Sequence, residues 1–286
     1  MKTKLLFIFS LTSLIGFSQN VTVNNGATLT VASGKYISIG GNFSNSGTTT
    51  LNSTSNSYSA LLVSGSSTGN ITYNRYVNTV GSGEWDLVGS PVGSQSISGF
   101  VSSNSGSVAT SGSTYAIGTY SNASGGGWSN YTTSSGSNDV ASAGNFPAGT
   151  GYQMASASGG TLAFTGTIAT SDQTVAITDN SGSGGTKWNL VANPFPSYLN
   201  GNSNAGTNNF FSTNSAVLHG SFQAIYGYDY DSGGSNYTPY NATSTWFIAP
   251  GQAFFVASAN ASGSSVAFNE NMQNASPSSY DDFVAN

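Results

Sequence analysis

Asp229 and Asp231 are the residues whose type and spacing come closest to a metal site. They alternate along the chain just before Ser232, Gly233 and Gly234. Carboxylate and backbone carbonyl oxygens are the ligands that calcium prefers, so this stretch could hold that ion. It departs from the EF-hand pattern, because glycine stands where a third acidic or amide ligand would be and no glutamate closes the loop. A β-hairpin with an Asp-Ser-Gly-Gly turn explains the same residues and is favoured. No other cofactor is expected.

The chain has little material for catalysis. It contains one histidine, His219, and no cysteine, so His-based triads, Cys-His dyads and zinc sites with several His or Cys ligands are excluded. His219 is expected to be an ordinary surface or strand residue. A glycosidase needs two carboxylates that face each other across a sugar-sized cleft. Glu84 and Asp86 flank Trp85, and alternate strand residues share one face, here expected to be in solvent. The sequence therefore predicts a protein that is not an enzyme.

Aromatic residues offer a different chemistry, the stacking of flat rings on sugars. They gather in two Tyr-rich stretches that are expected to form hairpins with Asn and Ser donors around them. The other interpretation is core packing or cross-strand pairing, because alternating tyrosines on a β-ribbon often cover a neighbouring sheet. The candidate binding face consists of Tyr120, Trp128, Tyr131, Tyr226, Tyr228, Tyr230, Tyr237 and Tyr240.

The Tyr-rich stretches belong to a duplicated unit. The stretch from Trp85 to Pro91 returns, at an offset of 103, as the stretch from Trp188 to Pro194. Residues 146–157 align without a gap on residues 248–259, at an offset of 102. Each of these two Trp-containing motifs has apolar residues followed by proline, which is typical of a buried strand that ends in a turn. The expected structural anchors are Trp85, Pro91, Trp188, Pro194 and Pro196, with the two tryptophans buried at equivalent places.

The residues before the repeat form brief alternating strands. Three of these strands are entered by Gly26, Gly34 and Gly47, which is compatible with a few turns of a β-solenoid or with an ordinary meander. The predicted fold class is all-β: an N-terminal β-segment of short strands, solenoid-like or a meander, followed by two tandem related antiparallel β-sandwich-like units. The expected parts are a signal peptide at 1–18, the Gly/Thr-rich β-segment at 19–80, unit 1 at 81–180, unit 2 at 181–275 and a C-terminal tail at 276–286.

The first residues predict export. Lys2 and Lys4 precede an apolar run, and small residues stand at the −3 and −1 positions of a cleavage after Ser18. The run is shorter than the about 18 apolar residues that a transmembrane helix needs, and no later segment could span a membrane. Cleavage leaves three cations against ten carboxylates, a formal net charge of 3 − 10 = −7. Nucleic acid is therefore not an expected partner, and the protein is expected to be secreted or held at the outer-membrane surface.

The Trp-containing motifs resemble sequence motifs of extracellular proteins of Bacteroidota, including flavobacteria, that are exported by the type IX secretion route. The stretches that carry the resemblance are Trp85 to Pro91, Trp188 to Ser197 and Ala249 to Val256. The resemblance implies secretion and no particular activity. Many of these proteins end in a C-terminal sorting domain, which this chain does not show. The sequence is therefore expected either to be a portion of a longer protein or to belong to a protein that is released or assembled differently.

Two functions are expected from these observations. The leading one is a non-enzymatic secreted or cell-surface structural protein, an adhesin that associates with other copies of itself, because few charged residues protect its strand edges from pairing. The alternative is a glycan-binding module of an extracellular carbohydrate-processing system, which would use the aromatic face. A glycan array discriminates between the two.

Overall fold

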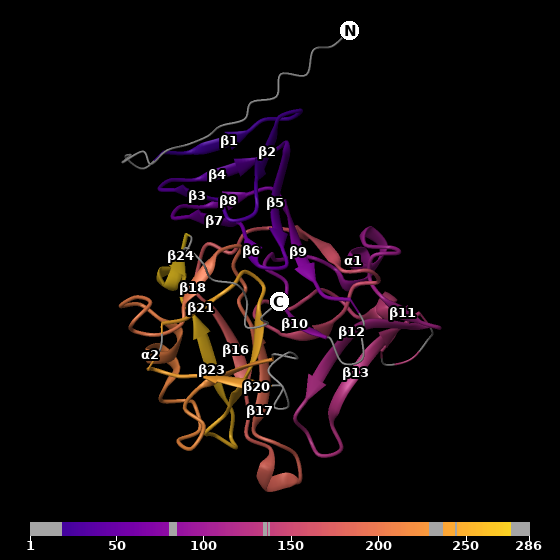
Figure 1. Ribbon diagram of the computed structural model, residues 1–286, viewed down its shortest axis with the longest axis vertical. Helices are drawn as coiled ribbons and strands as arrows, with labels where there is room; N and C mark the ends of the chain where they lie inside the picture. Colours follow the sequence, from indigo (N-terminus) through magenta and orange to yellow (C-terminus); the bar gives the residue numbers. More distant parts are fainter. Residues whose placement is uncertain are drawn as a thin grey trace.

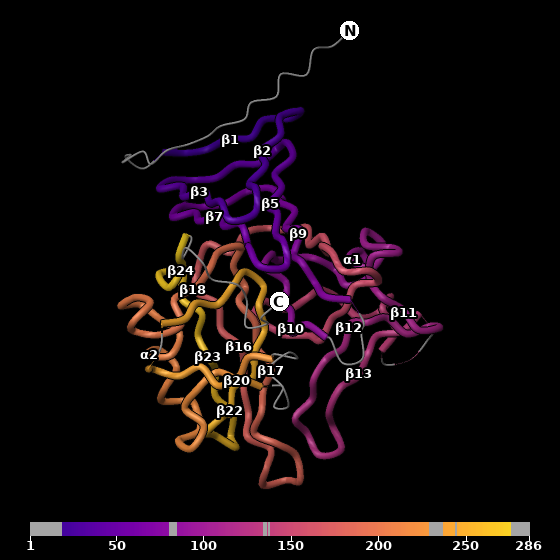
Figure 2. Tube along the Cα trace, in the orientation of Figure 1, coloured from indigo at the N-terminus to yellow at the C-terminus, as the bar shows by residue number. Residues whose placement is uncertain are grey.

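The computed structural model describes residues 19–79, 85–133, 136, 138–228, 237–243 and 245–275. Strands dominate this part of the chain, and its two α-helices are short, so the predicted all-β fold class is confirmed. Figure 1 shows a narrow stack of strands above two broader units. Figure 2 traces the indigo N-terminal strands into the magenta first unit and the orange-to-yellow second unit, which lie side by side. The expected signal peptide and C-terminal tail lie outside the described residues.

The N-terminal segment is a parallel β-solenoid and not a meander. The chain returns to the same side after each circuit, so strands far apart in sequence stack in parallel on three sides. Gly26 and Gly34 make the tight turns with φ of +81° and +69°, which only glycine adopts without strain. The three stacks are β1 (Val21–Val23) with β4 (Phe43–Asn45) and β8 (Ser67–Thr68); β2 (Thr28–Val31) with β5 (Thr48–Thr54) and β9 (Ile71–Val77); and β3 (Tyr36–Ile39) with β7 (Ala60–Val63).

Side-chain amides and alternating apolar residues hold the solenoid turns together. Asn20 Oδ1 accepts a hydrogen bond from the Asn42 amide nitrogen at 2.8 Å, and Asn42 Oδ1 accepts one from Ser66 at 2.9 Å. Alternate residues of each strand point inward, as in β3, where Ile39 is buried and Tyr36 is exposed. The short strand β6 (Ser57–Tyr58) folds back against β5. The longer strands of the three stacks, β1 to β5, β7 and β9, therefore contribute side chains to one interior.

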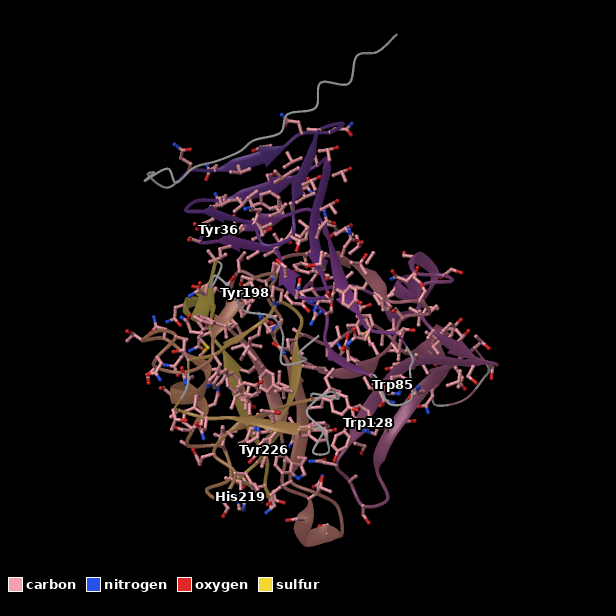
Figure 3. The ribbon with its side chains drawn as sticks, viewed as in Figure 1. Tyr36, Trp85, Trp128, Tyr198, His219 and Tyr226 are labelled. Atoms are coloured by element: carbon pink, nitrogen blue, oxygen red, sulfur yellow. The ribbon has the colours of Figure 1, made fainter. Side chains whose placement is uncertain are left out.

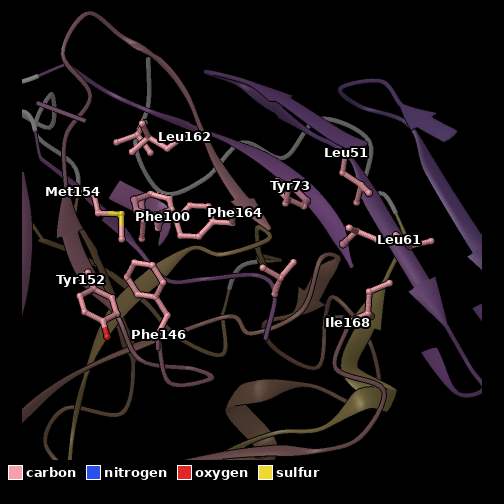
Figure 4. Close-up of a cluster of buried hydrophobic side chains, with 14 of the residues drawn as sticks. Leu51, Leu61, Tyr73, Phe100, Phe146, Tyr152, Met154, Leu162, Phe164 and Ile168 are labelled. Carbon is pink, nitrogen blue, oxygen red and sulfur yellow. The ribbon is translucent and has the colours of Figure 1, made fainter. Parts of the chain in front are cut away.

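The first unit shares its core with the solenoid. β15 (Gly160–Gly166) pairs antiparallel with β9, the last solenoid strand. Figure 4 shows the shared core, in which Leu51 and Tyr73 of the solenoid belong to the same cluster as Phe100 and Phe164 of the unit. The second sheet of the unit joins β10 (Asp86–Val88), β14 (Tyr152–Met154), β12 (Thr114–Ser121), β13 (Gly127–Thr132) and the short β11 (Thr110–Ser111), and α1 (Ile97–Ser103) contacts β15.

The second unit repeats this arrangement with its own strands. Its main sheet joins β17 (Trp188–Ala192), β22 (Ala253–Ala257), β19 (Ile225–Tyr228) and β20 (Tyr237–Tyr240), and β16 (Gln173–Ile177) pairs with β23 (Ser264–Phe268). The remaining elements are α2 (Phe210–Asn214), β18 (Tyr198–Asn200), β21 (Phe247–Ile248), β24 (Gln273–Asn274) and short 3₁₀ turns at Val140–Ser142, Ser181–Ser183 and Glu270–Met272.

The two units match strand by strand. The order β10-β14-β12-β13 returns as β17-β22-β19-β20. β9 pairs antiparallel with β15 in the first unit, and β16 pairs antiparallel with β23 in the second, so β9 and β16 are equivalent strands. If each unit is taken to begin at this strand, it begins before the expected boundaries at 81 and 181. An equivalent asparagine joins helix and strand in each. Asn104 donates to Phe100 O and Ala163 O, and Asn214 donates to Phe210 O and Ala267 O.

The units contact each other reciprocally. The Gly89 amide of the first unit donates to Gly251 O of the second at 2.8 Å, and Ala192 of the second donates to Gly149 O of the first at 2.7 Å. Gly89 and Ala192 are equivalent in the repeat, and so are Gly149 and Gly251. The contact therefore has the form of a two-fold, isologous interface within one chain. It is also close, because a Cβ on Gly89 would lie 2.3 Å from the Ala192 Cβ.

Candidate binding pocket

A pocket of about 290 Å³ opens where the two units meet. All of the lining residues in the described part of the chain are aromatic, and none of these is charged. β12 and β13 of the first unit supply two of the side chains, and β17, β19, β20 and β22 of the second unit supply the other four. Figure 3 labels Trp128 on the first unit and Tyr226 on the second. The lining of this aromatic pocket consists of Tyr120, Trp128, Trp188, Tyr226, Tyr237 and Phe255.

Two equivalent hairpins bring their aromatic side chains together at Phe255. Tyr120 is paired across the first hairpin with Trp128, and Tyr228 is paired across the second with Tyr237. The ring centroids within each pair are 5.3 Å apart. The Tyr120, Tyr237 and Trp128 rings all meet the Phe255 ring edge to face, with centroids 4.8, 5.5 and 6.0 Å away. This is the favoured geometry of aromatic pairs, so the rings hold one another in place.

Trp188 forms one wall of the pocket, and the expectation that both repeat tryptophans are buried is wrong. Trp188 is half-buried, and its ring lies 4.7 Å from Tyr226 at an interplanar angle of 80°. Trp85 is also half-buried and packs beside small alanines, among them Ala116. Trp188 is the first residue of β17, and Trp85 directly precedes β10. The tryptophan that is fully buried is Trp246.

The three predicted proline anchors are buried. Pro91 lies beside Gly251 at the contact between the units. Pro194 and Pro196 follow β17, and Pro196 O accepts a hydrogen bond of 2.7 Å from the Leu61 amide nitrogen of the solenoid. Pro91 therefore lies at the contact between the two units, and Pro196 at the contact between the second unit and the solenoid.

The other residues of the predicted binding face have separate positions. Tyr228 packs against Tyr237 beside the pocket but does not line it. Tyr131 shares a side-chain hydrogen bond with Tyr152 and packs on the first-unit core. Tyr240 lies 6.3 Å from the Trp246 ring, on the core side of its hairpin. Tyr230 lies outside the described residues.

Of the charged residues singled out in the sequence, the structure describes only some. Asp229, Asp231 and Glu84 lie outside the described residues. Asp86 was expected in solvent, but it is buried. Its carboxylate accepts hydrogen bonds from the Asn78 backbone and side chain at 2.7 and 3.1 Å, which offset the loss of hydration. His219 is half-buried with Nε2 3.0 Å from Lys187 Nζ. Within the described ranges, no three His, Cys, Asp or Glu side chains cluster so that they could hold a metal ion.

The pocket offers polar atoms as well as ring faces. Burial raises the pKa of the Tyr226 hydroxyl, and burial together with the nearby Tyr228 and Tyr120 hydroxyls raises that of Tyr237 to about 12. Both phenols are therefore protonated donors at neutral pH. Tyr120 Oη lies 3.2 Å from Thr186 Oγ1. The hydroxyls of Tyr226 and Tyr237 have no hydrogen-bond partner in the described part of the chain.

Buried tyrosines predict a loss of stability at alkaline pH. Burial raises the pKa of Tyr73 and Tyr152, as well as that of Tyr237, above the ordinary value of about 10. Above about pH 10 the unfolded chain releases these protons while the folded chain keeps them, so the free energy of unfolding falls as pH rises. Urea unfolding between about pH 8 and pH 11 measures this change. Tyr73→Phe is expected to reduce the loss, and an unchanged slope in that variant would contradict the assignment.

The fold and the pocket define a class of protein: an all-β chain in which a solenoid precedes two related β-sandwich-like units that share an aromatic pocket. The chain belongs to the family described as Domain of unknown function (DUF8693), whose model matches residues 8–284. That match covers the solenoid and both units. No curated protein and no solved structure matches the chain. No helix among the described residues is long and apolar enough to cross a membrane.

Proposed function

We propose that the protein is a secreted, non-enzymatic adhesive protein that attaches to extracellular glycans through the aromatic pocket. The observation that carries this proposal is the convergence of six aromatic side chains at the contact between the two units. The faces of sugar rings expose C–H groups that stack on aromatic rings, and their hydroxyls bind donors such as those of Tyr226 and Tyr237. The predicted signal peptide and the resemblance to type IX cargo support secretion.

The size and charge of the pocket favour one neutral ring. Its volume of about 290 Å³ lies just below the usual range for small-molecule sites, about 300–1,000 Å³. None of the six described lining residues could neutralise a carboxylate, sulfate or phosphate group. A neutral sugar whose substituents are all equatorial presents C–H groups on both faces. Glucose and N-acetylglucosamine in β-linkage have this property and are the ligands to test first.

The test is a glycan array probed with the full secreted chain. Trp128→Ala and Tyr237→Ala are each expected to weaken binding by about twofold to tenfold, because the stacking of a sugar on one ring is on the scale of the about 0.5–1.5 kcal/mol measured for aromatic pairs. Tyr36→Ala is the matched control, since Tyr36 is an exposed aromatic on the solenoid, 53% accessible and away from the pocket (Figure 3).

Two results would overturn the proposal. One is an array on which the wild-type chain binds no neutral glycan. The other is competition by tetramethylammonium, because boxes of aromatic rings also bind quaternary ammonium ions through cation–π contacts. Displacement of the glycan by that ion at equal or lower concentration would make the pocket a cation site.

Self-association is a second candidate function, and the open end of the solenoid favours it. β1, β2 and β3 each lie at an edge, with a single strand neighbour among the described strands. Lys35 is the only charged residue between residues 19 and 40. Edge strands without charged residues pair readily with other chains. The other end of the solenoid continues into the first unit, so pairing at this one end would stop at a dimer.

Light scattering at high concentration measures this association. The wild-type chain is expected to show a dimer, and Thr30→Lys, which places a charge on the outer face of β2, is expected to reduce it to monomer. Thr213→Lys, on the exposed surface of α2, is the control and should leave the dimer intact. A wild-type chain that stays monomeric at all concentrations would exclude this function.

A further inference from the structure

The pocket has a counterpart of different chemistry in the first unit. In the second unit, Leu190, Phe255 and Tyr226 are neighbours across three strands. The equivalent row of the first unit is Leu87, Gln153 and Gly118, followed by Asn130 on β13. The repeat therefore places glutamine and glycine where the pocket has phenylalanine and tyrosine. One row is aromatic, and the other presents the side-chain amides of Asn130 and Gln153, the amide pair.

The amide pair adjoins the aromatic pocket. Leu87, the strand neighbour of Gln153, lies in one apolar cluster with Leu190 and Phe255, so the two rows meet at these leucines. On β13, Asn130 follows Trp128 by two residues, which places both side chains on the same face of the sheet. A ligand that leaves the pocket past Trp128 therefore meets the amide pair next.

The amide pair is held in a fixed arrangement. Gln153 Nε2 donates to Asn130 Oδ1 at 2.7 Å, and Asn130 Nδ2 donates to the Tyr115 carbonyl at 3.0 Å. Gly118 leaves the room for this contact, because a Cβ there would lie 2.4 Å from Asn130 Oδ1. Gln153 is half-buried, and its Oε1 has no hydrogen-bond partner among the described residues. An oriented acceptor of this kind binds a hydroxyl with little loss of side-chain freedom.

We propose that the amide pair is a second sugar subsite, so that the ligand is a neutral oligosaccharide with one ring in the aromatic pocket and the next ring hydrogen-bonded to Gln153. This inference rests on the proposed function, because it assigns the neighbour of a ring bound in the pocket. Among the described residues neither subsite contains a charged side chain, so an uncharged sugar is the ligand to expect. The asymmetry of the two rows gives the chain of sugars a direction across the contact between the units.

Calorimetric titration of the full secreted chain tests the subsite by ligand length. The probes are glucose, cellobiose and cellotriose, and the corresponding N-acetylglucosamine series. The wild-type chain is expected to bind the disaccharide about tenfold more tightly than the monosaccharide, on the scale of one or two hydrogen bonds. Gln153→Leu, which keeps the side-chain size, is expected to reduce this gain below about threefold. Trp188→Ala is expected to weaken binding at every length.

The outcomes separate the subsite from the pocket. A length gain that persists in Gln153→Leu, or a wild-type chain without one, overturns the subsite while loss of binding in Trp188→Ala still supports the pocket. Loss of all binding in the wild-type chain overturns the proposed function and the subsite together. Asn130→Ala is the second variant and releases Gln153 from its fixed position. Thermal unfolding of each variant shows that it is folded, and Tyr36→Ala is again the control, with an unchanged length gain.

Discussion

Replacing Trp246 with alanine is expected to lower the free energy of unfolding by about 3–5 kcal/mol, the usual cost of removing a large buried aromatic side chain. Trp246 is 2% accessible and lies in the second-unit core. Its indole N–H donates to Asn241 O at 2.6 Å, and the ring fills the space above Gly201, where a Cβ would lie 1.8 Å from a ring carbon. Alanine would leave a cavity that its neighbours cannot fill.

The urea midpoint of unfolding, compared at constant slope, measures this loss. Trp128→Ala is the matched control, because Trp128 is 39% accessible and should cost less than about 1.5 kcal/mol. Trp188→Ala is expected to lie between the two, since its half-buried ring packs on Phe222 and Tyr226. A larger loss in Trp188→Ala than in Trp246→Ala would return Trp188 to the role of core anchor.

Asn104→Ala and Asn214→Ala are each expected to lower the free energy of unfolding by about 3 kcal/mol, and the two losses are expected to be similar. Asn214 joins α2 to β23 by donating to Phe210 O and Ala267 O and by accepting from the Ala267 amide at 2.7 Å. Asn104 makes the same three bonds in the first unit, with Ala163 N 2.7 Å away. Each substitution removes the side-chain partners of the N–H and C=O groups of Ala163 or Ala267, and a buried unpaired group costs about 1–3 kcal/mol.

Chemical unfolding of the two variants tests this equivalence. Asn204→Ala is the control, since Asn204 is exposed and should change the free energy of unfolding by less than about 0.5 kcal/mol. If one of the two substitutions proves harmless while the other is costly, the two asparagines do not serve the same purpose, and the match between the units is only a match of strand order.

Much of the fold could be predicted from local patterns. Alternation identifies the strand at 36–39, and the strand at 71–77 alternates between buried and half-buried residues along its whole length. The repeated motifs predict equivalent strand register in the two units. Leu87 aligns with Leu190 and Gln153 with Phe255, and Leu87 pairs with Gln153 as Leu190 pairs with Phe255. Parallel stacking of the solenoid could not be settled, because each strand is short and its partner lies a full circuit away in the chain.

The two helices show how a weak signal is missed. Ile97, Phe100 and Val101 are buried at helical spacing, and Ser96 caps the first turn by accepting from Gly99 N at 3.1 Å. α1 spans only Ile97–Ser103, so the apolar period is too brief to stand out among Ser and Gly residues that disfavour helix. The signal for this helix in the sequence is the capping Ser96 followed by Ile97, Phe100 and Val101 at helical spacing.

The pocket could be predicted only in part. Tyr120, Trp128, Tyr226 and Tyr237 belong to the predicted binding face, and all four line the pocket. Phe255 was missed, although it follows Phe254 in a strand, where adjacent side chains point to opposite faces and one of the two must leave the core. The convergence of these residues depends on how the units face each other, which no local pattern records.

The reciprocal contact between the units has a consequence for symmetry. Two identical subunits joined by an isologous interface must present the same side chain at both equivalent positions. An aromatic row on one side of the axis would then require an aromatic row on the other. Fusion of the two copies into one chain removes that constraint, so Phe255 and its counterpart Gln153 are able to differ. Covalent linkage thus permits a polar and an apolar half within a frame that is otherwise two-fold, which a homodimer of the same unit could not provide.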